Sequence, residues 1–315
     1  MRNKLLNSIR LEGRIYGHNL TQRVSGENSK NPGTPFINGT IDIALDDEGV
    51  DIVQVHYTYV TANFNSGKPN ANFPLLQQII EQNKTWQTVG KEDAQMIQVS
   101  GSTIDVNDFI SRTGEMVSAQ RAEGGFINLV NSINPDVKTR SFLQADMLIT
   151  KAIRVEADEE KGLPERVDLT GAVFNFRNEL KPVKFEVTVP GGMDYFEGEE
   201  PSETKPLFTK VRGSVHGIKT VRKVEEDSAF GEPVVREFET MRRVWEVDWA
   251  QTEPYDFGED GADLTTAELK KMISDREVFL ADVKKRDEEY KNSVASTPTT
   301  EKKEEKVADT SVFTF

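Results

Sequence analysis

The stretch Ile-Arg-Leu-Glu-Gly-Arg-Ile-Tyr-Gly (residues 9–17) alternates apolar and polar side chains. A period of two is typical of a strand with one buried face, so this stretch predicts such a strand. Gly13 lies in its middle, where a glycine permits a sharp bend or strong coiling. The alternation returns in residues 36–45 and 51–60, on either side of the turn sequence Asp-Asp-Glu-Gly (residues 46–49). These two segments predict a hairpin after the first strand.

A helix and further strands follow the hairpin. Residues 73–86 carry leucine and isoleucine at helical spacing, with Asn72 placed as a cap, and strands are expected at residues 96–106, 116–119 and 126–130. This order is that of a five-stranded Greek-key barrel of the oligonucleotide-binding (OB) type. The predicted fold class is therefore mainly β, with one or two OB-like Greek-key barrels, an additional C-terminal helix and a disordered acidic tail.

The strand pattern repeats once along the chain. Residues 166–176 echo the first strand, and residues 183–189, 208–215 and 234–249 parallel later strands. Duplication is a common route to two domains. We therefore expect a first barrel with an inserted helix in residues 1–150, a second barrel-like domain in 151–250, an acidic loop and helix in 251–291, and a tail in 292–315.

The C-terminal part holds one amphipathic helix and a charged tail. Residues 266–291 place apolar side chains on one helical face, which indicates a helix that caps the second barrel or serves for docking or oligomerisation. From residue 292 the chain is too poor in apolar residues to form a core. Phe313 and Phe315 near its end are typical of a short motif that inserts into a partner's pocket, or of an end that docks on its own domain.

Three segments resemble the barrel strands of single-stranded DNA-binding proteins, namely Leu-Glu-Gly-Arg-Ile (11–15), Ile-Gln-Val-Ser-Gly (97–101) and Phe-Ile-Asn-Leu-Val (126–130). The charged tail ending in Phe is similar to theirs, with one aspartate where theirs have a cluster. The resemblance implies that a barrel binds single-stranded DNA. It also implies that the tail tip, here Asp309, Val312, Phe313 and Phe315, recruits replication, recombination or repair proteins.

Composition limits the classes of function. The 315 residues contain no cysteine, which removes disulfides, thiol catalysis and thiolate metal sites, and the three histidines lack metal-ligand spacing. The sequence has no long apolar run, so we expect neither a membrane span nor a signal peptide, and a cytoplasmic location in a bacterium or a phage-infected cell. The net charge of −14 argues against general phosphate binding but leaves room for a local basic groove, which the acidic tail could occupy in the absence of DNA.

Binding of single strands needs aromatic rings for base stacking and Lys or Arg for phosphates. Candidates in the first half are Tyr16, Tyr57, Tyr59, Phe64, Trp86, Arg10, Arg14, Lys91, Arg112 and Arg121. Tyr57 and Tyr59 are two residues apart and are expected to share one strand face, either a stacking platform or core. The densest basic region lies in the second half and contains Lys210, Arg212, Lys219, Arg222, Lys223, Arg242 and Arg243, with Trp245 beside it. Its alternative role is ion pairing with neighbouring acids such as Glu239.

No motif indicates catalysis, since phosphate-cradling loops, zinc-protease motifs and nucleophile elbows are all missing from the sequence. We therefore expect no enzyme, cofactor or metal. The function predicted is sequence-independent binding of single-stranded DNA in replication, recombination or repair. Two alternatives stay open: a virion structural protein of the tail or capsid surface, and a DNA-mimicking inhibitor.

Overall fold

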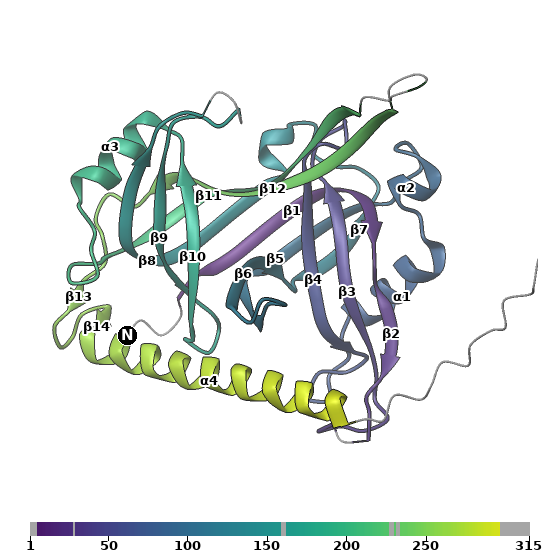
Figure 1. Ribbon diagram of the computed structural model, residues 1–315, viewed down its shortest axis with the longest axis horizontal. Coiled ribbons are helices and arrows are strands. Elements are labelled where there is room, and N and C mark those ends of the chain that lie inside the picture. The colour runs from purple at the N-terminus through teal and green to yellow at the C-terminus, as the bar shows by residue number, and fades with distance from the viewer. Residues whose placement is uncertain (1–4, 28, 159–161, 227–229, 231–233, 297–315) are drawn as a thin grey trace, which may run out of the picture.

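The computed structural model describes residues 5–27, 29–158, 162–226, 230 and 234–296 (Figure 1). The strands are β1 (Asn7–His18), β2 (Thr21–Val24), β3 (Pro35–Ala44), β4 (Ile52–Thr61), β5 (Met96–Ile110), β6 (Met116–Glu123), β7 (Phe126–Val130), β8 (Ser141–Val155), β9 (Arg166–Phe174), β10 (Leu180–Val187), β11 (Leu207–Glu226), β12 (Val234–Ala250), β13 (Phe257–Gly258) and β14 (Leu264–Thr265). The helices are α1 (Asn72–Gln82), α2 (Trp86–Val89), α3 (Pro190–Gly198) and α4 (Thr266–Ser296), with a 3-10 turn at Val137–Thr139.

The first half of the chain forms a closed ring of strands, called here the first barrel. β1 pairs with β3 and β5, β3 with β4, and β5 with β6, all antiparallel, and a parallel pairing of β4 with β6 closes the ring. α1 lies between β4 and β5 in the chain. This is the strand order of the OB fold, with the helix between its third and fourth strands.

The second half repeats this arrangement in a second barrel. β8 pairs with β9 and β11, β9 with β10, and β11 with β12, all antiparallel, and β10 closes the ring by pairing parallel to β12. α3 lies between β10 and β11, the position that α1 has in the first barrel. The predicted fold class is confirmed: the chain is mainly β, with Greek-key barrels of OB type and a C-terminal helix.

The two barrels are joined into one sheet. β1 pairs antiparallel with β8 from Asn7–Ala145 to Leu11–Ser141, and one hydrophobic cluster includes buried side chains of both barrels, such as Val55 and Phe185. β8 carries a second, smaller cluster on its other face, through Leu148 packed with Phe174 and Phe208. The second barrel therefore begins at Ser141, before the boundary expected near residue 151.

Gly13 occupies a crowded point of β1. A Cβ atom at this position would lie 2.2 Å from the carbonyl oxygen of Ala44. The pairing of β1 with β5 ends at the next residue, Arg14, and the pairing with β3 begins there. A glycine allows the backbones to approach this closely, as expected for a strand that coils around a barrel.

Three details differ from the sequence-based expectations. The helix expected over residues 73–86 ends at Gln82, because Asn83 adopts a left-handed conformation with φ 45°. Asn72 does not cap it; its side-chain amide instead donates to the carbonyl of Gly125 (2.7 Å) and accepts from the amide of Ile127 (3.1 Å). Residues 126–130 resemble a barrel strand, but the ring of the first barrel is closed by β6, and β7 extends the sheet at the other end of β5.

Helix α4 runs beneath both barrels (Figure 1). Its first turns pack Leu269 and Met272 against the cluster on the outer face of β8. Farther along, the guanidinium of Arg276 lies 2.7 Å from the carboxylate of Asp108 in β5. The helix thus packs against the second barrel and also reaches the first. None of the helices described is long and apolar enough to cross a membrane.

Candidate nucleic-acid interface

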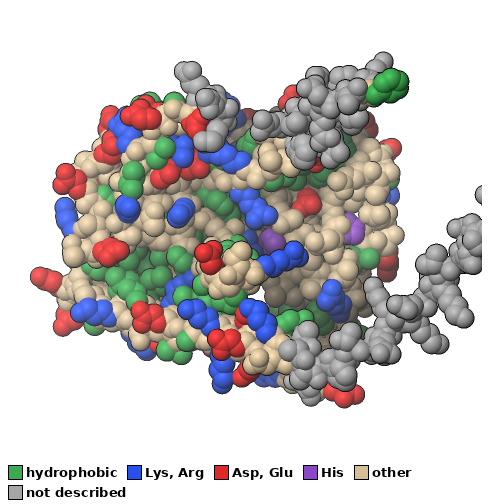
Figure 2. Space-filling model, in the orientation of Figure 1, with side chains coloured by type: hydrophobic (Ala, Val, Ile, Leu, Met, Phe, Trp, Pro, Cys, Tyr) green, Lys and Arg blue, Asp and Glu red, His purple; other side chains and the backbone are tan. Residues whose placement is uncertain are grey.

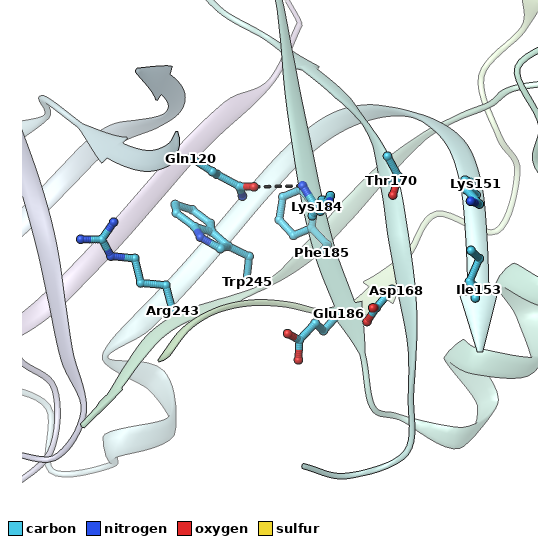
Figure 3. Close-up of a pocket in the computed structure, with 10 residues that line it drawn as sticks. All are labelled: Gln120, Lys151, Ile153, Asp168, Thr170, Lys184, Phe185, Glu186, Arg243 and Trp245. Atoms are coloured by element: carbon cyan, nitrogen blue, oxygen red, sulfur yellow. Dashed lines mark hydrogen bonds between the residues drawn. The ribbon is translucent and has the colours of Figure 1, made fainter. Parts of the chain in front are cut away.

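The face where the barrels meet is hollowed by two adjoining cavities, which together we call the inter-barrel groove. The larger has a volume of about 490 Å³ and lies over β8, β9 and β10, with Gln120 of β6 and Arg243 and Trp245 of β12 on its walls (Figure 3). The smaller lies between β4 and β11 and shares Arg243 and Trp245 with it. Lys and Arg side chains gather around this hollow in Figure 2.

Two rows of side chains cross the floor of the larger cavity. Thr170 of β9 is opposite both Lys151 of β8 and Lys184 of β10, which makes a cationic row. A second row lies two residues away on each strand, where Asp168 of β9 is opposite both Ile153 of β8 and Glu186 of β10. We call it the acidic row after its two carboxylates. Residues two apart on a strand share a face, so all six side chains line the same cavity.

The two rows differ in how their charges are compensated. Lys151 and Lys184 are exposed, and within the described part of the chain neither ammonium group has an ion-pair partner. In the acidic row, the carboxylate of Asp168 lies 2.7 Å from Nε of Arg166, and Glu186 pairs with Arg242 and, at 3.8 Å, with Arg166. The uncompensated charge of the floor is therefore positive.

The smaller cavity is lined by His56 and Arg121 of the first barrel and by Arg243 of β12 in the second. Arg243 donates to the side-chain oxygen of Gln54 (3.2 Å), and Arg121 pairs with Glu123 (3.0 Å). Burial, followed by the charges of Arg121 and Arg243, lowers the pKa of His56 to about 4. His56 is therefore a neutral ring at neutral pH, beside Arg243 and the Arg121–Glu123 pair.

A second cluster of predicted residues lies outside the groove. The rings of Tyr16 in β1 and Trp86 in α2 are 5.9 Å apart, and each has a lysine ammonium 5.9 Å from its centroid, Lys219 over Tyr16 and Lys91 over Trp86. Both lysines also have acidic partners, Glu239 at 2.7 Å and Asp47 at 3.7 Å. Folding thus brings together residues from three distant parts of the sequence.

A protein-family model, YorF, matches residues 6–286. The chain belongs to the YorF family. The matched residues of this YorF member cover both barrels and most of α4, so the groove lies within the family's shared region.

No curated protein matches the sequence. Among solved structures, this YorF member is similar to the crystal structure of a deletion mutant of the single-stranded DNA binding protein from Thermus aquaticus, with a TM-score of 0.46 and 11% identity. The likeness covers 82% of this chain and 98% of the other. The OB fold of both barrels follows from their strand pairing.

Tyr57 and Tyr59 do not share a face in this YorF member, which corrects the expectation from their spacing. Ile37 is opposite Val60 while Gly39 is opposite Tyr57, so β4 has one extra residue at this point. Such a bulge reverses the alternation. Tyr57 points into the barrel and is 2% exposed, whereas Tyr59 is 47% exposed, with its ring 4.7 Å from that of Phe36. Tyr57 is a core residue and cannot stack on a base.

Trp245 also differs from its predicted role. It lines both cavities of the YorF groove, but it is only 6% exposed and packs edge-on against Phe185, with ring centroids 6.3 Å apart. Trp245 therefore forms the wall of the groove and offers no platform for stacking.

The remaining predicted cations are dispersed. Arg10 donates to the carbonyl of Thr139 (3.3 Å), Arg212 stacks over Trp249 with its guanidinium 4.4 Å from the ring centroid, and Arg242 is paired with Glu186. Arg14 is half-buried in β1, Lys210 lies on β11, and Arg112 and Phe64 lie in exposed turns. The side chains of Arg222 and Lys223, and the tail residues Asp309, Val312, Phe313 and Phe315, are outside the described residues.

Of the groove's cations, sequence reasoning identified Arg121 and Arg243 and missed Lys151 and Lys184. The exposure of Lys184 could have been predicted from sequence, because the strand Val-Lys-Phe-Glu-Val (residues 183–187) alternates and places Lys184 and Glu186 on its polar face. Lys151 comes after three consecutive apolar residues, Met147–Ile149, and Thr150, so this part of β8 shows no alternation of apolar and polar residues. Only the register of three strands brings the two lysines together.

Proposed function

We propose that the chain binds single-stranded DNA in the inter-barrel groove. The observation that carries the proposal is the cationic row, Lys151 and Lys184, uncompensated on the outer face of the first three strands of an OB-type barrel. The outer face of the second and third strands is where OB folds commonly bind oligonucleotides and oligosaccharides.

The dimensions of the row suit a flexible polyanion. Lys151 and Lys184 are separated by one intervening strand, so their backbones are roughly 10 Å apart at about 4.8 Å per strand. Two ammonium groups at this spacing contact separate phosphates, and Arg243 extends the path toward the first barrel. Ile153, which is 43% exposed beside the row, provides an apolar contact for a base.

The net charge of −14 does not oppose this proposal. Charges on exposed surfaces are screened over about 8–10 Å at physiological salt, so a bound phosphate interacts mainly with the groove itself. The acids nearest the row, Asp168 and Glu186, are already paired with arginines. The groove thus remains locally attractive to phosphate.

The proposal is tested by removing the cationic row. We expect the double variant Lys151→Ala/Lys184→Ala to bind a labelled single strand roughly tenfold or more weakly, and its slope of log affinity against log salt to fall by about 1.4, at about 0.7 per lost phosphate contact. Fluorescence anisotropy across a salt series measures both. The matched control is Lys271→Ala/Lys284→Ala, which removes two exposed lysines of α4. Equal effects of the two variants would refute the assignment of the groove.

A second part of the proposal concerns the C-terminal segment, residues 297–315. We propose that it competes with DNA for the basic groove and that Phe313 and Phe315 recruit a partner protein. Its aromatic residues at the end of a charged, apolar-poor stretch support this. A chain ending at residue 296 is expected to bind DNA more tightly at low salt, with the difference fading at high salt. Identical affinities of the two chains at low salt would contradict competition.

A further inference from the structure

The acidic row gives the inter-barrel groove a feature that phosphate binding does not explain. Asp168 and Glu186 lie two residues from the cationic row, which is roughly 7 Å along the strands. Arginines compensate the charge of both carboxylates, but carboxylate and phosphate oxygens are all acceptors, so a phosphate gains no hydrogen bond from this row. A strand with its phosphates over Lys151 and Lys184 and its bases on the side of Asp168 and Glu186 matches both rows.

The two carboxylates are held in place and keep free acceptor positions. Nε of Arg166 lies 2.7 Å from Oδ1 of Asp168 and 3.8 Å from Oε2 of Glu186, and Arg242 also donates to Glu186. These contacts use only part of the roughly four lone-pair sites on each carboxylate. The side chain of Asp168 is 44% exposed and that of Glu186 is 21% exposed, so both remain accessible from the cavity.

A carboxylate discriminates between bases by the donors they carry. The N4 amino group of cytosine and the N6 amino group of adenine donate hydrogen bonds, whereas thymine presents the O4 acceptor at the corresponding position and has its only base donor, N3–H, between the acceptors O2 and O4. When a carboxylate of this row faces thymine O4, both are acceptors and neither is hydrogen-bonded, which is unfavourable where water is partly excluded. Cytosine and thymine are similar in size, so this difference is mainly one of donor against acceptor.

We infer that Asp168 and Glu186 make the groove prefer single strands whose bases carry an exocyclic amino group, cytosine over thymine in the simplest comparison. The inference rests on the proposed function and names the bases that the groove selects. Lys151 and Lys184 contact phosphates in every sequence, while the acidic row sets the preference. The preference is modest, because only the bases that lie over this row are affected.

The test compares labelled oligo-dC, oligo-dT and oligo-dU of equal length by fluorescence anisotropy, at slightly alkaline pH so that oligo-dC stays unfolded. We expect oligo-dC to bind about five- to tenfold more tightly than oligo-dT, from one good pairing per site. Oligo-dU controls for the thymine methyl group and is expected to bind like oligo-dT. Equal affinity for oligo-dC and oligo-dT, or a preference for oligo-dT, overturns the inference.

Variants locate the preference. Asp168→Asn/Glu186→Gln is expected to bind oligo-dC and oligo-dT with equal affinity, because the amides both donate and accept. The control Glu203→Gln/Glu277→Gln changes the net charge equally at exposed positions away from the groove and is expected to retain the preference. A preference that survives in the groove variant overturns the role of these residues. If the wild-type chain binds none of the strands, the proposed function fails, and this inference with it.

Discussion

At the scale of single residues, the contact between His216 and Asp51 links the two barrels and depends on pH. Nδ1 of His216 lies 2.6 Å from Oδ2 of Asp51, whose Oδ1 also accepts from the amide of Gly217 (2.9 Å). Burial lowers the pKa of His216. The hydrogen bond to Asp51 and the charges of Asp51 and Glu246 raise this pKa, and together they outweigh burial, so the net shift is upward. The pair therefore stabilises the fold fully below the unfolded pKa of about 6.5 and loses this contribution as pH rises through the folded value.

This contact predicts a pH-dependent cost of substitution. His216→Gln is expected to lower the free energy of unfolding by about 1–2 kcal/mol at acidic pH, where the wild-type histidine is charged, and by less at alkaline pH. Urea unfolding of both proteins at pH 6 and pH 9 measures the difference. A loss that is the same at both pH values would mean that the charge of His216 does not contribute.

Residue-scale prediction from sequence succeeds where alternation is unbroken. In β10 the pattern correctly separates buried Val183 and Phe185 from Lys184 and Glu186. In β4 it fails after Tyr57, because one extra residue turns Tyr59 to the other face. The bulge depends on how β3 pairs with β4, and the sequence of β4 alone does not encode that.

At the scale of elements, α4 depends on one buried ion pair to hold it against the first barrel. Asp108 has a side chain that is 1% exposed, and Arg276 approaches both of its oxygens, at 2.7 and 3.3 Å. Removing the arginine leaves a buried carboxylate without its charge partner. Arg276→Ala is therefore expected to cost about 3 kcal/mol in the free energy of unfolding.

The same helix supplies the control. Arg286 pairs with Asp282 one turn away at 2.8 Å, with both side chains more than half exposed. Arg286→Ala is expected to change the free energy of unfolding by less than about 0.5 kcal/mol, since exposed pairs contribute little. Chemical denaturation of the two variants checks the contrast, and a similar cost for both would argue against docking of α4 through Arg276.

The elements that were misplaced from sequence share a physical cause. β8 is buried on both faces over part of its length, with Met147 and Ile149 in one cluster and Leu148 in the other, so its apolar run lacks the period of two. As a result Arg166–Phe174 was matched to the first strand of the first barrel, although by pairing it corresponds to β3. Strands with one solvated face were recognised from sequence.

At the scale of the whole molecule, two OB-type rings share a sheet and a core, and the groove lies where their faces meet. The repeated strand pattern indicated two similar halves, but the pairing of β1 with β8 and the groove itself come from contacts between residues far apart in sequence. The site was predictable only in part for that reason. Overall acidity also concealed it, because its positive charge is local.

The most direct test of the central claim is an anisotropy titration of the unmodified chain with a labelled mixed-sequence single strand, at low and moderate salt, beside a duplex of equal length. A groove that binds phosphates along a flexible strand predicts binding of the single strand, weaker at moderate salt, and much weaker binding of the duplex. Absence of single-strand binding at low salt, also in a chain that ends at residue 296, would contradict the account.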